Sequence, residues 1–127
     1  MEDTLKKFVF TEYKSTKSDL FAAFLIQVSN LTKPNGLIGF ICPYVWMFIQ
    51  SYEELRNFII KNNTITSLVQ LAYNAFGPAV VPIATFTLRN ELLENYQGNY
   101  VKLSDFKGVE NQAPKTLEAI QNPDCGW

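Results

Sequence analysis

The sequence predicts an α/β fold in which helix, strand, helix, strand and strand follow one another. Helical apolar spacing at 19–32 and 51–62 alternates with short apolar runs at 37–42, 64–71 and 83–88. The run over 37–42 is continuously apolar, which is typical of a strand buried on both faces. Three strands are too few for a self-sufficient sheet, so we expect exposed strand edges and a slice of a larger domain.

The first predicted helix begins after Ser18 and Asp19, which are its candidate N-caps. Its apolar face is wide enough to suggest burial on more than one side. That face comprises Leu20, Ala23, Phe24, Leu25, Ile26, Val28 and Leu31. The turn residues Pro34-Asn35-Gly36 end the helix and lead into the strand 37–42.

The second predicted helix begins at a capping box, because Ser51 and Glu54 can each satisfy a backbone donor near the other. The strands 64–71 and 83–88 follow, separated by a loop over 72–82. This short separation predicts that the last two strands form an antiparallel hairpin.

The chain divides into three parts by composition. Residues 1–17 read as a loop leading into the domain, 18–90 hold the predicted helices and strands, and 91–127 read as an irregular polar tail. The tail ends on the apolar residue Trp127, which looks like a cut rather than a completed end.

Composition excludes several kinds of site. The chain has no histidine, so it contains no Ser-His-Asp or Cys-His catalytic set. Its only cysteines, Cys42 and Cys125, match no zinc-binding spacing, and Cys42 reads as a small buried hydrophobe. A net charge of −1 argues weakly against nucleic-acid binding by the chain alone.

No apolar run is long enough to span a membrane, so we expect no membrane partner. No signal peptide is visible, and we expect a reducing cytoplasmic location.

Several segments, in this order and spacing, resemble the second half of a gamma-type N6-adenine DNA methyltransferase, with a Rossmann-like sheet. They are Lys17-Ser-Asp-Leu-Phe-Ala-Ala-Phe24, Leu31-Thr-Lys-Pro-Asn-Gly36, Leu37-Ile-Gly-Phe-Ile-Cys-Pro43, Ser51-Tyr-Glu-Glu-Leu-Arg56, Phe76 and Ile83-Ala-Thr-Phe86. The tail segments 100–107 and 115–127 resemble the PglX-type methylases of bacterial phage-exclusion systems. Type IIG restriction-modification proteins have a similar methylase core.

The resemblance implies an S-adenosylmethionine-dependent parent enzyme that acts on double-stranded DNA and needs no metal. The family's Asn/Asp-Pro-Pro-Tyr/Phe loop and Gly-rich cofactor motif do not occur here. In the family's order both precede residue 1, so we expect no catalytic residue in this chain and no cofactor bound by the chain alone. The tail 91–127 would start the link toward a target-recognition region.

Leu20 and Phe24 match the family positions that flank the cofactor's adenine. Both also lie on the apolar stripe of a predicted helix, so a purely structural place in the core is the alternative.

Phe76 matches the aromatic residue that packs against the flipped target base, and Tyr73 is the second candidate for this contact. A π-face holds an adenine ring without using its hydrogen-bonding edge. The alternative is a loop aromatic that plugs the end of the sheet.

Other residues carry weaker hypotheses. Pro43, Tyr44 and Trp46 follow the first strand at its carboxyl end, where α/β sheets place ligands, although Trp46 equally fits a cover over the sheet end. Asp19 reads as a helix cap rather than a catalytic acid. The four lysines near the N-terminus suit DNA phosphates or a solvated face, and these are Lys6, Lys7, Lys14 and Lys17.

Three functions therefore remain open. The first is an inactive segment of a DNA adenine methylase, whose natural partner is the missing N-terminal half. The second is a stand-alone interaction module that regulates a methylase or defence complex by adding to a sheet edge. The third is an unrelated nucleotide-binding α/β protein, which the absence of a Gly-x-x-x-x-Gly-Lys loop disfavours. Exposed strand edges also predict self-association.

Overall fold

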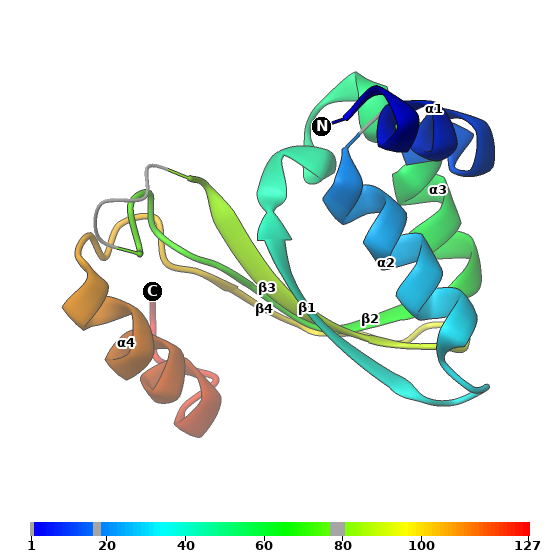
Figure 1. The fold of residues 1–127 in the computed structure, drawn as a ribbon. Coiled ribbons are helices and arrows are strands. Elements are labelled where there is room, and N and C mark those ends of the chain that lie inside the picture. The colour runs from blue at the N-terminus through cyan, green and yellow to red at the C-terminus, as the bar shows by residue number, and fades with distance from the viewer. Residues whose placement is uncertain (1, 17–18, 77–80) are drawn as a thin grey trace.

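The computed structural model describes residues 2–16, 19–76 and 81–127. The predicted order of helix, strand, helix, strand and strand is confirmed within this part of the chain (Figure 1). The helices are α1 (Asp3–Glu12), α2 (Leu20–Leu31), α3 (Glu53–Asn62) and α4 (Val109–Gln121). The strands are β1 (Leu37–Pro43), β2 (Thr64–Gln70), β3 (Ile83–Arg89) and β4 (Asn99–Lys102).

The four strands form one mixed sheet in the order β1-β3-β2-β4. The central strand β3 pairs antiparallel with both β1 and β2, so the predicted antiparallel pairing of the last two strands is confirmed. The edge strand β4 runs parallel to β2. As a result β1 and β2 point the same way, although β3 lies between them.

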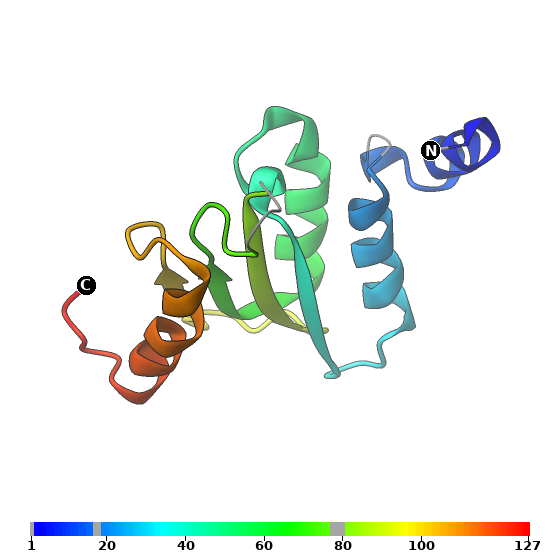
Figure 2. The same cartoon turned by 60° about the vertical axis from the view of Figure 1, so that its left-hand side comes forward.

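The helices α2 and α3 cover one face of the sheet, whereas α4 lies apart from them on the β4 side (Figures 1 and 2). Alternate β3 residues Ala84, Phe86 and Leu88 are buried, as the period of two in a half-covered strand requires. Phe86 packs against Phe40 and Trp46, with ring centroids 5.9 and 5.5 Å apart. The core around these rings includes Ala22, Leu25, Ile26, Ile38, Cys42, Tyr52, Leu55, Ile59 and Leu68.

The prediction that the strand over 37–42 is buried on both faces is wrong, because β1 is an edge strand and Leu37, Gly39 and Ile41 are exposed on the open face of the sheet. A bulge in β2 near Thr66 brings hydroxyl groups together on the neighbouring strands. The Thr87 hydroxyl lies 2.6 Å from that of Thr66 and 2.7 Å from that of Ser67.

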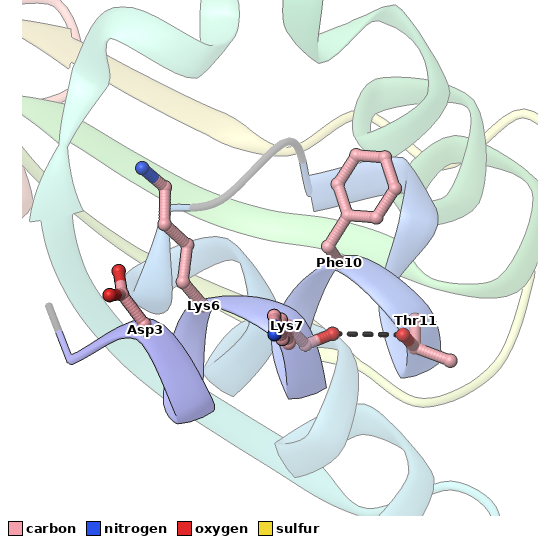
Figure 3. Close-up of a pocket in the computed structure, with 5 residues that line it drawn as sticks. All are labelled: Asp3, Lys6, Lys7, Phe10 and Thr11. Carbon is pink, nitrogen blue, oxygen red and sulfur yellow. Dashed lines mark hydrogen bonds between the residues drawn. The ribbon is translucent and has the colours of Figure 1, made fainter.

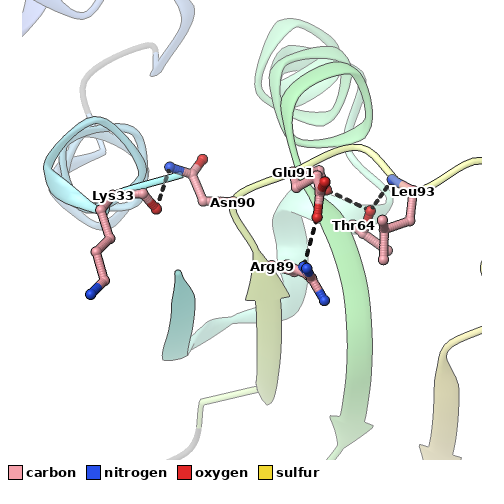
Figure 4. A network of polar contacts seen from close by, with 6 residues as sticks. All are labelled: Lys33, Thr64, Arg89, Asn90, Glu91 and Leu93. Carbon is pink, nitrogen blue, oxygen red and sulfur yellow. Dashed lines mark hydrogen bonds and ion pairs between the residues drawn. The ribbon is translucent and has the colours of Figure 1, made fainter. Parts of the chain in front are cut away.

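Asn90, directly after β3, closes the far end of the sheet (Figure 4). Its Nδ2 donates to the carbonyls of Thr32 at 2.6 Å, Ser29 at 3.3 Å and Lys33 at 3.4 Å, which satisfies carbonyls left free at the end of α2. Its backbone N–H also donates to the Gly36 carbonyl at 2.8 Å. Beside it, the Thr64 hydroxyl donates to the Glu91 carbonyl at 2.6 Å.

Two segments differ from the sequence-based expectation. The expected loop over 1–17 contains the helix α1, and the expected irregular tail over 91–127 contains β4 and α4. Pro114 lies inside α4, and an internal proline ordinarily argues against a helix because it removes a backbone donor.

The predicted capping box at Ser51 is also wrong. The helix α3 has Tyr52 at its N-cap position and no side-chain cap hydrogen bond. A 3-10 turn over Gln50–Tyr52 runs directly into α3, so backbone geometry rather than a side chain starts this helix.

Candidate functional site

Leu20 and Phe24 lie outside the hydrophobic core, which contradicts the alternative that they are purely core residues. Phe24 is 56% exposed and Leu20 is 38% exposed, while the buried face of α2 carries Ala22, Leu25 and Ile26. Together they line an apolar hollow of about 160 Å³ between α1 and α2. Its other lining residues are Leu5, Phe8, Val9, Tyr13, Ala23 and Gln27.

The helix α1 supplies the second wall of this hollow, and the sequence-based reasoning missed it. Val9 is fully buried, and the Tyr13 hydroxyl donates to Gln27 Oε1 at 2.8 Å across the two helices. The Tyr13 ring packs edge-on against Phe8 at 6.1 Å. The helical spacing of Leu5, Phe8 and Val9 is the signal that predicts this contact.

Tyr73 and Phe76 both present their rings to solvent in the turn after β2. Tyr73 is 57% exposed and Phe76 is 49% exposed, whereas the intervening Ala75 is buried. Gly77 and Pro78, the rest of the predicted presenting loop, lie outside the described residues. Each ring is therefore accessible to a planar ligand, and neither plugs the end of the sheet.

The two candidate pairs do not meet in one pocket within the described residues. Leu20 and Phe24 share their hollow with α1, whereas neither Tyr73 nor Phe76 lines it. The N-terminal end of α2 and the turn after β2 nevertheless belong to the same end of the sheet, because β1 and β2 run in the same direction (Figure 1). In α/β sheets ligands bind beyond the carboxyl ends of such strands.

Trp46 does not line a groove, because it is buried against Phe86 at the end of β1. The hypothesis of a substrate-facing Trp46 is therefore wrong, and its alternative as a cover of the sheet end is confirmed. Cys42 beside it is buried as predicted. Burial raises the pKa of the Cys42 thiol to about 11, and the Trp46 side chain beside it opposes this shift by a smaller amount.

Pro43 and Tyr44 lie at the carboxyl end of β1, as predicted. The Tyr44 ring packs edge-on against Phe48 at 5.9 Å, and its backbone N–H donates to the Pro82 carbonyl at 3.0 Å. Tyr44 is only partly exposed, and its contacts are with the protein itself.

Asp19 takes the N-cap position of α2, but it makes no side-chain cap hydrogen bond there. Its Oδ2 instead accepts a hydrogen bond from the Tyr52 hydroxyl. The carboxylate thus ties the start of α2 to the start of α3. Ser18, the other candidate cap, lies outside the described residues.

Lys6 and Lys7 lie on the surface of α1 beside Phe10 (Figure 3). They border a hollow of about 510 Å³ that is lined only by residues of this one helix, together with Asp3 and Thr11. A single helix face cannot enclose a ligand, so the hollow is an open surface. Lys14 is also exposed, and Lys17 lies outside the described residues.

Two kinds of feature are absent from the described ranges 2–16, 19–76 and 81–127. No group of three or more His, Cys, Asp or Glu residues lies close enough together to hold a metal ion. No helix in those ranges has the length and apolar character needed to cross a membrane.

The structure is similar to that of a Listeria monocytogenes protein assigned to the class I S-adenosylmethionine-dependent methyltransferases. The TM-score is 0.59 at 22% identity, and the match covers 80% of this chain and 32% of that protein. At this identity the likeness shows the fold alone, which is an α/β fold with a mixed four-stranded sheet.

Two curated relatives are adenine-specific methyltransferases. PglX of Lacticaseibacillus casei (strain Zhang) is 35% identical over 130 residues, which cover 100% of this chain and 11% of PglX. BrxX of Escherichia coli O9:H4 (strain HS) is 30% identical over 128 residues, which cover 98% of this chain and 10% of BrxX. The chain thus spans about a tenth of the length of these relatives.

A family model described as Eco57I restriction-modification methylase matches residues 1–76, which is more than half of the 127 residues. The matched range includes α1, α2, β1, α3 and β2, together with all four residues of the two candidate pairs. The resemblance drawn from the sequence is therefore confirmed, and the chain belongs to the Eco57I restriction-modification methylase family.

Proposed function

We propose that this chain is a segment of an S-adenosylmethionine-dependent DNA adenine-N6 methyltransferase, downstream of its catalytic loop and inactive alone. The observation that carries the proposal is the 35% identity of the whole chain to about a tenth of an adenine-specific methyltransferase. The absence of both an Asn-Pro-Pro-Tyr loop and a Gly-x-Gly motif in the sequence supports the claim of inactivity. The parent enzyme would serve restriction-modification or phage defence and would bind double-stranded DNA.

Leu20 and Phe24 would contact the adenine portion of the cofactor, which supplies the methyl group when bound. Their apolar hollow of about 160 Å³ suits a planar ring, but it is smaller than the roughly 300 Å³ at the low end of small-molecule sites. The residues present therefore fit one part of the cofactor only. The missing N-terminal half would hold the rest.

Phe76, with Tyr73 beside it, would stack on the flipped target adenine. Both rings are exposed after β2, at the end of the sheet where ligands bind. Stacking on an aromatic ring contributes about 1–3 kcal/mol per base and leaves the exocyclic amine free to react. The chain would thus hold the base, while the groups that activate its amine would come from the missing half.

A chimera tests the proposal, with this chain replacing the matching segment of the Lacticaseibacillus casei PglX protein. We expect the chimera to methylate adenine in DNA. Phe76→Ala should lower kcat/KM for DNA, and the ratio should correspond to a loss of about 1–3 kcal/mol of transition-state stabilisation. Phe24→Ala should raise KM for the cofactor. Phe10→Ala removes another exposed ring and serves as the matched control.

Equal losses in Phe76→Ala and Phe10→Ala would count against the stacking role. Calorimetry on the chain alone provides an independent check, since we expect no tight S-adenosylmethionine binding. Tight binding would overturn the claim that the cofactor site is incomplete.

The rival function is a stand-alone module that adds to a sheet edge of a partner protein. One observation favours it, because β1 is an edge strand of the described sheet and its outward residues are exposed. A coding sequence that continues upstream into a Gly-rich motif and an Asn-Pro-Pro-Tyr loop would exclude this rival.

A further inference from the structure

Gln112 is a buried polar residue that joins the backbone after β2 to the segment that leads into α4. Its side-chain Oε1 accepts a hydrogen bond from the Ala72 backbone N–H at 2.9 Å, across 40 residues of sequence. Its Nε2 donates to the carbonyls of Phe106 at 2.6 Å and Gly108 at 2.8 Å. Every hydrogen-bonding group of the primary amide faces the protein, and the residue is 7% exposed.

The hydrogen bond to Ala72 falls where the sheet ends and the candidate base-contacting turn begins. The parallel pairing of β2 with β4 finishes with Leu103 N–H donating to the Gln70 carbonyl at 2.9 Å. One residue later Leu71 N–H donates to the Ile83 carbonyl at 3.0 Å. The next N–H that faces β4 is that of Ala72, and it donates to Gln112 Oε1. In a longer β4, a backbone carbonyl would accept this hydrogen bond instead.

Ala72 sets the position of the two exposed rings. Its carbonyl accepts from Ala75 N–H at 3.2 Å, and both alanines are buried. These contacts fix the inner side of the turn, so Tyr73 and Phe76 extend outward from it. A displacement of Ala72 would carry both rings with it.

We propose that Gln112 is a positioning residue that fixes the turn of Tyr73 and Phe76 relative to α4. This inference rests on the proposed function, in which these rings hold the target adenine. The hydrogen bonds of Gln112 make the helix α4 and the base-contacting turn move together. Such a contact raises the rate because it holds the rings that contact the base within a fraction of an ångström of the productive position.

The chemistry of the amide gives a specific test. Gln112→Glu keeps the shape and the acceptor, but a carboxylate cannot donate to the Phe106 and Gly108 carbonyls. A protonated carboxyl group regains one donor and keeps an acceptor, so low pH should restore the anchor. Gln121→Glu is the matched control, since Gln121 is exposed on the same helix.

Amide hydrogen exchange on the chain alone measures the anchor directly. In Gln112→Glu at about pH 8 we expect the protection factor of the Ala72 amide to fall about tenfold. It should recover toward about pH 5, because burial beside the Phe106 and Gly108 carbonyls raises the pKa of the introduced carboxyl group above its usual range. Gln121→Glu should match the unmodified chain at both pH values. If Gln112→Glu fails to fold, the unmodified chain still tests the hydrogen bond from the Ala72 amide to Gln112. An Ala72 amide with a protection factor no higher than that of the exposed Asn74 amide would overturn it.

The PglX chimera measures the catalytic consequence. In Gln112→Glu at about pH 8 we expect kcat to fall about tenfold or more with little change in KM for DNA, and activity relative to the unmodified chimera to recover at low pH. Unchanged kcat despite lost Ala72 protection would overturn the positioning role. If the unmodified chimera fails to methylate adenine, the proposed function fails, while the exchange experiment still decides whether Gln112 anchors the turn.

Discussion

Cys42 and Trp46 lie side by side at the end of β1, and burial is the main cause of their properties. The thiol has no charged neighbour to stabilise its thiolate, so removal from water favours the protonated form and raises its pKa to about 11. Trp46 Nε1 is buried and meets no hydrogen-bond partner among residues 2–16, 19–76 and 81–127, which is a cost that packing against Phe86 offsets. Neither residue has the environment of a reactive group.

The raised pKa of Cys42 makes the free energy of unfolding depend on pH. The folded state holds the thiol proton up to about pH 11, whereas the unfolded state releases it near its ordinary pKa of 9.0. Stability from this group is therefore complete below pH 9.0 and falls as pH rises toward 11, by up to about 3 kcal/mol.

Urea unfolding at a series of alkaline pH values checks this expectation. Tyrosine and lysine residues titrate in the same range, so the informative quantity is the difference from Cys42→Ala, in which this part of the pH dependence disappears. Identical slopes in the two proteins would contradict it.

At the scale of elements, strong periodicity was enough to predict α2, β1, α3, β2 and β3 and the antiparallel pairing of β2 with β3. The sequence pattern failed to predict α1 and α4 for physical reasons. The helix α1 buries only Val9, while Leu5, Phe8 and Phe10 stay exposed, so its apolar spacing marks no wide core-facing stripe, and Pro114 argues against α4. The strand β4 has only four residues, and its parallel pairing with β2 depends on a partner distant in sequence.

Asn90 is the polar contact on which the far end of the α2–sheet packing depends. Asn90→Ala removes the donor to three carbonyls at the end of α2, so we expect the free energy of unfolding to fall by about 1–3 kcal/mol. Urea denaturation measures the change.

Asn57→Ala is the control for that substitution, because Asn57 is exposed on α3 and alanine favours a helix. We expect no loss of stability there. An equal effect of the two changes would show that the Asn90 contacts are not stabilising.

At the scale of the whole molecule, helices cover one face of the sheet while residues of β1 stay exposed on the other. Large apolar side chains remain on the surface as well, including Leu31 and Leu37. This distribution agrees with the proposed segment of a longer enzyme. The residues of the candidate site lie as two separate pairs, Leu20 with Phe24 and Tyr73 with Phe76. The resemblance to the family located each pair, but no local sequence pattern predicts how the two pairs are arranged in space.

The open face and edge of β1 lead us to expect self-association of the isolated chain. Light scattering should show a mass that rises with concentration. Ile41→Lys places a charge on the open face of β1 and should shift the chain toward monomer, whereas Ile60→Lys, at a similarly exposed position on α3, should not. A clean monomer at high concentration would contradict the expectation.

The place of β3 between β1 and β2 also governs how the chain acquires its structure during synthesis. In the part of the chain that the structure describes, β1 and β2 do not pair with each other; β1 pairs with β3, and β2 pairs with β3 and with the still later strand β4. A ribosome must therefore complete Arg89 before either earlier strand has a neighbour. Until then both strands have unpaired edges, so translation of 64–89 is the interval in which a chaperone would matter most for this segment.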